Sequence, residues 1–238
     1  MRQIYYATGS GGMTFDVGEG GGNPFASALI ELADAPELQL RDLATRLRAL
    51  TAEKSQGHQL VECVGSPYRS TWGFREPPAA WQERRDALVL VVSDYSLFDP
   101  AASLRGAARD ERRISGMLAA HGFSVIQGID PRREALIAAL RAFRRRSQQA
   151  DIGVIYSTGH GIELEGEVFL LPGDYPRQGG YSRAQLRRHA VPVKQMAQAA
   201  CASKVNLVFF AGCRTHSDAV RVAAPFSTAR TAPHQTPS

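Results

Sequence analysis

Two side chains capable of nucleophilic chemistry follow apolar stretches of strand length. His160 comes directly after "DIGVIYSTG", and Cys213 ends "NLVFFAGC". If the two stretches are neighbouring parallel strands, their carboxyl ends meet at one edge of a sheet and bring the imidazole near the thiol. A thiolate attacks carbonyl carbon, and a histidine beside it can take the thiol proton and later protonate the leaving group. The pair therefore indicates nucleophilic catalysis, against the alternative of a buried structural thiol and an unrelated histidine.

The other cysteines and histidines offer no comparable arrangement. The three cysteines, Cys63, Cys201 and Cys213, are odd in number, and their spacings fit neither a disulfide framework nor a zinc site. Cys63 falls in an apolar strand-like segment and Cys201 in an alanine-rich helical one, which indicates packing roles. Of the remaining histidines only His216 lies near Cys213, and no motif surrounds it. No compact Asp/Asn loop of the calcium-binding type occurs, so we expect no essential metal or other cofactor.

The elements that must position these residues alternate between strand and helix, which is typical of an α/β fold with an open, doubly wound, mostly parallel sheet flanked by helices. Apolar runs predict strands at 87–95, 124–129, 151–161 and 206–213, with a short strand or hairpin arm at 166–174. Helical periodicity predicts helices at 106–123, 131–149 and 192–205. The first third adds strands at 3–8 and 58–65 and helices at 23–34 and 38–55.

Composition and charge limit the class of function. The chain of 238 residues is 44% hydrophobic without low-complexity bias, which favours one globular domain. It has no apolar run of about 18 residues and no secretory-type start, so we expect a cytoplasmic protein without membrane contact. The net charge of +5 would suit a nucleic-acid partner. However, the dense basic run at 141–146 lies at helical spacing behind the apolar residues Leu136, Ile137, Leu140 and Phe143, which indicates a solvated helix face and no nucleic-acid partner.

The glycine-rich stretch "GSGGMTFDVGEGGG" at 9–22 has two interpretations. Glycine amides ahead of a helix can bind anions, which suggests a nucleotide or phosphate site. Its spacing matches neither of the common phosphate-loop patterns, and it contains no lysine. We therefore rank phosphate binding below cysteine chemistry.

Three stretches between about residues 86 and 216, two of which contain the runs around His160 and Cys213, resemble the caspase, metacaspase and prokaryotic caspase-like peptidases. They are "LRGAARDERRISGMLAAHGF", "DIGVIYSTGHGIELEGEVFLLPGD" and "NLVFFAGCRT". The separation of His160 and Cys213 is also close to the roughly fifty residues of the caspase pattern. The resemblance implies a cysteine endopeptidase with Cys213 as nucleophile and His160 as base and acid. It further implies that the backbone amides of Gly161 and Cys213 bind the oxyanion.

The two halves of that domain stand in reversed order. The family domain ordinarily continues past the cysteine, and "YYATGSGGMTFDVGEGGGNPFASALIEL" at the start of the chain is similar to that continuation. The resemblance therefore implies a circularly permuted caspase-like fold, which requires the strand at 3–8 to lie beside the strand at 205–212. Halves exchanged between two chains would give the same site in an obligate homodimer. The predicted parts are a small-subunit-like half at 1–70, a linker at 71–85, a large-subunit-like half at 86–216 and a disordered tail at 217–238.

Substrate preference is implied by three positions. Metacaspases and their prokaryotic relatives cleave proteins after Arg or Lys, using carboxylates to pair with the desolvated cation. Asp110 resembles the first-helix acid of this set, and Asp16 falls where caspases that cut after Asp carry an arginine. Ala211 stands where the relatives commonly have Asp, so an inactive pseudoprotease that binds a protein or regulatory partner remains an alternative. For Asp110 the alternative is a solvated acid between Arg109 and Arg112.

Overall fold

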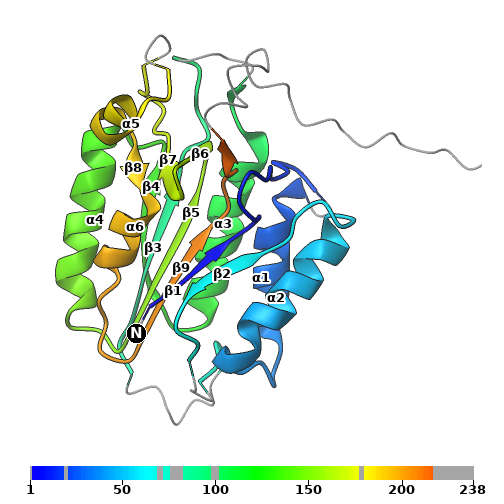
Figure 1. Cartoon of the computed structure of the whole chain (residues 1–238). Helices are drawn as coiled ribbons and strands as arrows, with labels where there is room; N and C mark the ends of the chain where they lie inside the picture. The colour runs from blue at the N-terminus through cyan, green and yellow to red at the C-terminus, as the bar shows by residue number, and fades with distance from the viewer. Residues whose placement is uncertain are drawn as a thin grey trace, which may run out of the picture.

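A six-stranded sheet with the order β2-β1-β9-β5-β3-β4 forms the centre of the fold (Figure 1). The structure is a computed structural model that describes residues 2–18, 21–68, 72–75, 83–97, 102–176 and 180–216. Every neighbouring pair of strands is parallel except β1 with β2. The strands are β1 (Gln3–Tyr6), β2 (Glu62–Gly65), β3 (Arg85–Val91), β4 (Ser124–Ile129), β5 (Ile152–Thr158) and β9 (Val205–Phe210).

Helices cover both faces of this sheet, which explains why the strands at its middle are apolar along their whole length. Every residue of β3, β5 and β9 is buried. The core on one face includes side chains of α1 (Pro24–Asp34), α2 (Leu40–Lys54) and α3 (Arg105–Ala120). The core on the other face includes side chains of α4 (Arg133–Ser147), α5 (Arg183–His189) and α6 (Val193–Ala199). The predicted doubly wound α/β arrangement is confirmed.

A second sheet, of four short strands in the order β10-β6-β7-β8, lies over the second face. The predicted arm at 166–174 is β7 (Glu167–Leu170), which forms an antiparallel hairpin with β6 (Gly161–Leu164). The other two strands are β8 (Val191–Pro192) and β10 (Thr215–His216). Periodicity did not predict these two strands or α5, because elements this short are fixed by their neighbours rather than by their own pattern.

The first third of the chain belongs to the same sheet and core as the rest. β1 pairs in parallel with β9, with Gln3 opposite Leu207, so the predicted adjacency of these two strands is confirmed. The rings of Tyr5 and Phe209 stack with centroids 5.1 Å apart. Together these contacts join the beginning of the chain to the strand that leads to Cys213.

Part of the predicted linker packs in the core. Trp72 and Phe74 are buried in the core beneath α1 to α3, and Tyr68 just before them is buried there too. Aromatic side chains of this size remove much apolar surface from water, which fixes the segment in place. Residues 69–71 and 76–82 of this region, and the predicted tail at 217–238, lie outside the described residues.

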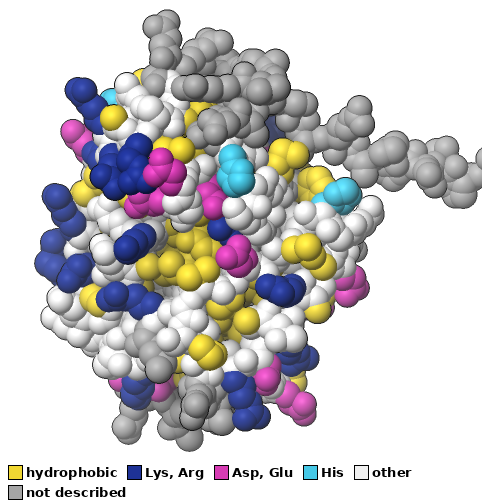
Figure 2. Space-filling model, in the orientation of Figure 1, with side chains coloured by type: hydrophobic (Ala, Val, Ile, Leu, Met, Phe, Trp, Pro, Cys, Tyr) yellow, Lys and Arg dark blue, Asp and Glu magenta, His cyan; other side chains and the backbone are white. Residues whose placement is uncertain are grey.

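The surface of α4 matches its sequence pattern. Leu136, Leu140 and Phe143 are buried, whereas Arg144 and Arg145 are exposed. Figure 2 shows lysine and arginine side chains gathered on the side of the molecule where α4 and α5 lie. The predicted solvated helix face is confirmed. Among the described residues, no helix has both the length and the apolar character needed to span a bilayer.

Candidate active site

The structure places His160 and Cys213 at the same edge of the sheet. β5 and β9 are adjacent and parallel, with Ser157 opposite Phe210. The amide of Ala211 donates to the carbonyl of Ser157 at 2.8 Å, which continues the pairing beyond the end of β9. His160 follows β5 and Cys213 follows β9, so the two loops leave the sheet side by side.

Glycines allow these two loops to approach closely. A Cβ atom on Gly161 would fall 2.1 Å from the carbonyl oxygen of Cys213, and one on Gly212 would fall 2.7 Å from the carbonyl oxygen of Gly159. Both distances are shorter than any real contact of a Cβ atom. The backbones on either side of the two candidate catalytic residues are therefore in direct contact.

Hydrogen bonds determine which nitrogen of His160 is available as a base. Its Nε2 lies 2.7 Å from the carbonyl oxygen of Ala102. Because a carbonyl only accepts, Nε2 carries the proton in the neutral ring, and Nδ1 is left as the acceptor. The backbone amide of His160 donates to the Tyr95 hydroxyl at 2.8 Å, and that hydroxyl donates to the carbonyl of Leu171 at 2.8 Å. Tyr95 also holds the imidazole by ring contact, with centroids 4.4 Å apart.

Burial sets the charge state of this histidine. Desolvation lowers the pKa of His160 below its ordinary value, although the Ala102 carbonyl and the negative charge of Asp16 act in the opposite direction. Desolvation also raises the pKa of Tyr95, so its hydroxyl stays protonated. At neutral pH the imidazole is therefore neutral and can accept a proton.

A residue of the glycine-rich stretch contacts the thiol. The amide of Thr14 lies 3.3 Å from Cys213 Sγ, and the Thr14 hydroxyl lies 3.4 Å from it. The same hydroxyl lies 3.4 Å from the carbonyl oxygen of Ala211. The sequence analysis did not single out Thr14, and only the pairing of β1 with β9 brings it to the site.

Comparison with protein families identifies the fold that carries this site. A family model described as the caspase domain matches residues 84–236, which is more than half of the chain. The chain belongs to the caspase domain family. A search of curated proteins found no match. Membership assigns the chain to a family of cysteine peptidases, and the matched region contains both His160 and Cys213.

Asp16 binds the start of α3 in this caspase domain. Its two carboxylate oxygens accept hydrogen bonds from the amides of Gly106 at 2.9 Å and Ala107 at 3.0 Å. The residue that precedes α3, Leu104, offers no side-chain cap of its own. Asp16 therefore caps α3 from a distant part of the chain, and it remains partly exposed beside the site.

Asp110 lies beneath the residues that lead into α1. Its side chain is 0% exposed, so the alternative of a solvated helix-face acid is wrong. The carboxylate accepts from the amide of Asn23 at 2.9 Å and pairs with Arg113 at 3.1 Å. A Cβ atom on Gly22 would fall 2.0 Å from Asp110 Oδ1, so glycine is needed for this contact. A substrate side chain reaches this carboxylate only if residues 22 and 23 move.

Ala211 is nearly as enclosed as Asp110. It is 2% exposed and packs in the core that contains α1 and α3. Its carbonyl accepts from the side-chain amide of Asn23 at 3.3 Å. That amide also donates to the carbonyl of Phe15 at 2.8 Å, while Asn23 Oδ1 caps α1 through the amide of Phe25. Asn23 thus fixes the glycine-rich stretch against the strand end that precedes Cys213.

Arg214, directly after the candidate nucleophile, belongs to the quoted motif "NLVFFAGCRT", but the sequence analysis predicted no role for it. It is 5% exposed, and its Nε lies 3.0 Å from a carboxylate oxygen of Glu163 on β6. Its Nη1 pairs with Glu62 on β2, and its guanidinium lies 4.4 Å from the centre of the Tyr6 ring on β1. This buried cation joins three strands at the base of the Cys213 loop.

Desolvation gives Asp110 an unusual pH dependence, since it raises the pKa of this carboxyl to about 7 against the opposing effects of Asn23 and Arg113. A raised pKa in the folded state means that protonation stabilises the fold. This stabilisation is fully present below the pKa of the carboxyl in the unfolded chain, about 3.9, and it is lost as the pH rises through the pKa in the folded protein. Asp110→Asn mimics the neutral acid at every pH. We therefore expect the difference in free energy of unfolding, variant minus wild type, to increase by about 2 kcal/mol when the pH is raised from about 5 to about 8.

Urea denaturation of both proteins at the two pH values measures this difference. Asp42→Asn, which removes an exposed acid of α2, is the matched control for the loss of a carboxylate. A constant difference between Asp110→Asn and the wild type would contradict the raised pKa.

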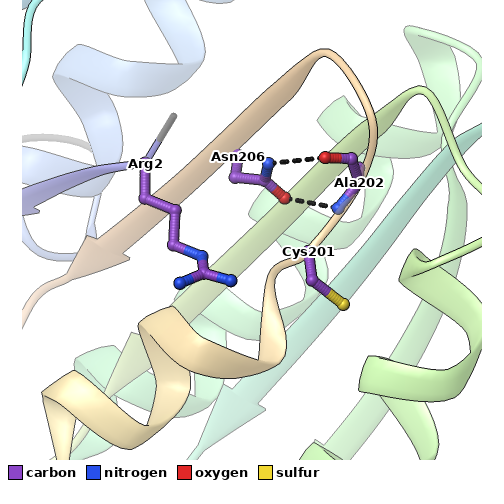
Figure 3. Close-up of a pocket in the computed structure, with 4 residues that line it drawn as sticks. All are labelled: Arg2, Cys201, Ala202 and Asn206. Atoms are coloured by element: carbon purple, nitrogen blue, oxygen red, sulfur yellow. Dashed lines mark hydrogen bonds between the residues drawn. The ribbon is translucent and has the colours of Figure 1, made fainter.

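A shallow hollow at the opposite edge of the sheet is separate from this site. Figure 3 shows it lined by Arg2, Cys201, Ala202 and Asn206. Cys201 was predicted to lie in a helix, but α6 ends at Ala199 and Cys201 begins the loop before β9. Its thiol donates to the carbonyl of Arg144 at 3.3 Å. The site edge and this edge lie at opposite ends of β9, so Cys201 has no part in the chemistry of Cys213.

Proposed function

We propose that this caspase domain is a cysteine endopeptidase with a Cys213–His160 dyad. The observation that carries the proposal is the orientation of His160. The Ala102 carbonyl binds Nε2 of the ring and Tyr95 contacts the ring, so Nδ1 is the nitrogen that can accept a proton at the strand end beside the Cys213 loop. Burial keeps that ring neutral, as a general base requires.

The reaction follows from these positions. The Cys213 proton passes to Nδ1 of His160, and the thiolate attacks the carbonyl carbon of the scissile peptide bond. The amides of Gly161 and Cys213, on two backbones in contact, donate to the oxyanion. His160 then gives its proton to the leaving amine, and water hydrolyses the thioester.

We further propose that the substrate residue before the scissile bond is Arg or Lys. Asp16 is the partly exposed carboxylate of the site, and its charge acts on both His160 and Asp110. Asp110 lies behind residues 22 and 23 and pairs with Arg113, so in this arrangement it does not contact a substrate. Asp16 is therefore the carboxylate that a substrate cation would meet.

Fluorogenic peptides that differ only in the residue before the scissile bond test this function. We expect Arg and Lys peptides to be cleaved at least about 10-fold faster in kcat/KM than norleucine or Asp peptides, because only a cation gains an ion pair. Asp16→Asn should reduce cleavage of the Arg peptide while leaving the norleucine peptide nearly unchanged. Faster cleavage of the Asp peptide would overturn the proposed specificity.

A second candidate is a caspase-like module that binds protein without cleaving it. One observation favours it, the uncharged Ala211 two residues before Cys213. A peptide with an electrophilic end group distinguishes the two functions. Selective labelling of Cys213 over Cys63 and Cys201 supports the peptidase, and equal labelling of all three supports the binding module.

We also propose that the chain is a circular permutant. Two observations support this. The family match covers 84–236, while β1, β2, α1 and α2 lie before it yet share the sheet and core. A chain rejoined so that residues 1–75, which include the buried Trp72 and Phe74, follow residues 83–238 through a flexible linker should fold and cleave the same peptides as the wild type. A rejoined chain that stays unfolded would contradict the permutation.

A further inference from the structure

The hydroxyl of Thr14 stands between two acceptors. It lies 3.4 Å from Cys213 Sγ and 3.4 Å from the carbonyl oxygen of Ala211. A hydroxyl has one proton to donate, so it can serve only one of them at a time. The backbone amide of Thr14, 3.3 Å from Sγ, points to the same sulfur. The Cys213 sulfur therefore has one fixed donor, the Thr14 amide, and one donor that can rotate toward it or away from it, the Thr14 hydroxyl.

We propose that Thr14 is a positioning residue for the Cys213 nucleophile, and that its hydroxyl turns from the Ala211 carbonyl to the sulfur when the thiol loses its proton. The inference rests on the proposed function, because it concerns the thiolate on which that function depends. Thr14 touches the nucleophile from the part of the chain before the family match, so it is supplied by β1 and the stretch that follows it.

The proton count is balanced in both states. In the neutral state the S–H of Cys213 donates to Thr14 Oγ1, and the Thr14 hydroxyl donates to the Ala211 carbonyl. In the ionised state the thiol proton resides on Nδ1 of His160, so the sulfur has only lone pairs. The Thr14 hydroxyl then donates to the sulfur, and the amide donates to it in both states. Because hydrogen bonds to an ionised acceptor are the stronger ones, the turn favours the thiolate.

Contacts on either side hold Thr14 in place. The amide of Arg214 donates to the carbonyl of Gly12 at 2.9 Å, and the amide of Phe15 donates to Gln59 Oε1 at 3.1 Å. Gln59 is fully buried, so the second anchor does not depend on solvent. With the backbone fixed before and after Thr14, rotation of its side chain is the remaining motion that the turn requires.

The ionisable groups around the sulfur are consistent with this role. His160 and Tyr95 approach from the ends of β5 and β3, and Asp16 acts on the imidazole. The guanidinium of Arg214 is held by Glu163 and Glu62. The charged groups among these neighbours, Asp16 and Arg214, have partners of their own, and Thr14 is a neutral donor.

The test is the pH dependence of alkylation of Cys213 by iodoacetamide, followed by mass spectrometry of the peptide that contains this residue. We expect Thr14→Val to move the midpoint of the reaction up by about one pH unit, because the thiolate loses a donor while the side-chain shape is kept. Thr14→Ser keeps the hydroxyl and should stay near the wild type. Ser10→Ala is the matched control, since Ser10 lies in the same stretch but bonds to Glu163.

The outcomes separate this inference from the proposed function. A merely structural role for Thr14 would lower thermal stability without moving the midpoint, and an unchanged midpoint in Thr14→Val would overturn the inference. An equal shift in Thr14→Ser would overturn it too, because the hydroxyl is then irrelevant. The alkylation needs no peptide substrate, so a shifted midpoint in a protein that cleaves no peptide would support Thr14 while rejecting the peptidase.

Discussion

Replacing Cys213 by alanine is expected to abolish cleavage of the Arg and Lys peptides, with kcat/KM falling by at least roughly 10⁴-fold. The side chain supplies the only thiol at this edge of the sheet among the described residues, and a thiolate is a far stronger nucleophile than the hydroxyl of Thr14 beside it. The thiol is partly exposed beyond the end of β9, so its loss leaves the core unchanged. Fluorogenic assays on purified protein measure the loss, and thermal unfolding verifies that the variant is folded.

Cys201→Ala is the matched control for this prediction. It removes a thiol of similar exposure from the opposite end of β9, where the hollow of Figure 3 lies. We expect its cleavage rate to stay within about two-fold of the wild type, because effects of well-separated sites are independent. A Cys213→Ala variant that still cleaves at the control's rate would reject Cys213 as the nucleophile.

Replacing Arg214 by methionine is expected to destabilise the fold by about 3–5 kcal/mol. Methionine keeps much of the side-chain volume but leaves Glu163, which is 5% exposed, without its cationic partner. The interaction with the Tyr6 ring is lost as well. Urea denaturation measures the change, and the slope with denaturant should remain that of the wild type.

Two further variants test whether the stability lost in Arg214→Met comes from the unpaired buried charge of Glu163. Adding Glu163→Gln to Arg214→Met should recover part of the stability, since no buried charge is then left unpaired. Arg183→Met breaks the exposed pair with Glu165 at the β6–β7 turn, and it should cost less than about 1 kcal/mol. If the two arginine variants lose equal stability, burial of the Arg214 pair has no special role.

The strands that form the middle of the sheet could be predicted from sequence, since they are buried on both faces. β3, β5 and β9 fall on continuous apolar runs. The edge strand β4, which is only partly buried, also matches its predicted range. The place of β1 beside β9 came from resemblance rather than periodicity, because a strand of four residues does not specify its partner. His160 and Cys213 could be proposed together because both follow such runs, and parallel strands end at one edge.

The contacts within the site could not be predicted in the same way. Asp110 looks like a surface acid between Arg109 and Arg112, but the backbone of residues 22 and 23 covers it. Thr14 and Asp16 gain their partners from strands and helices about ninety to two hundred positions away along the chain. Their roles depend on tertiary packing, which no local pattern of residues encodes.

The pairing of Gln3 with Leu207 has a consequence for how the protein is made. During synthesis β1 emerges first, and its parallel partner is among the last described strands to leave the ribosome. Until β9 arrives, Thr14 has no sulfur to face, and one edge of β1 has no strand to pair with. Closure of such a distant contact is slow compared with local folding. A chain released before β9 would therefore contain most of the sheet yet lack Cys213, the residue that we propose as the nucleophile.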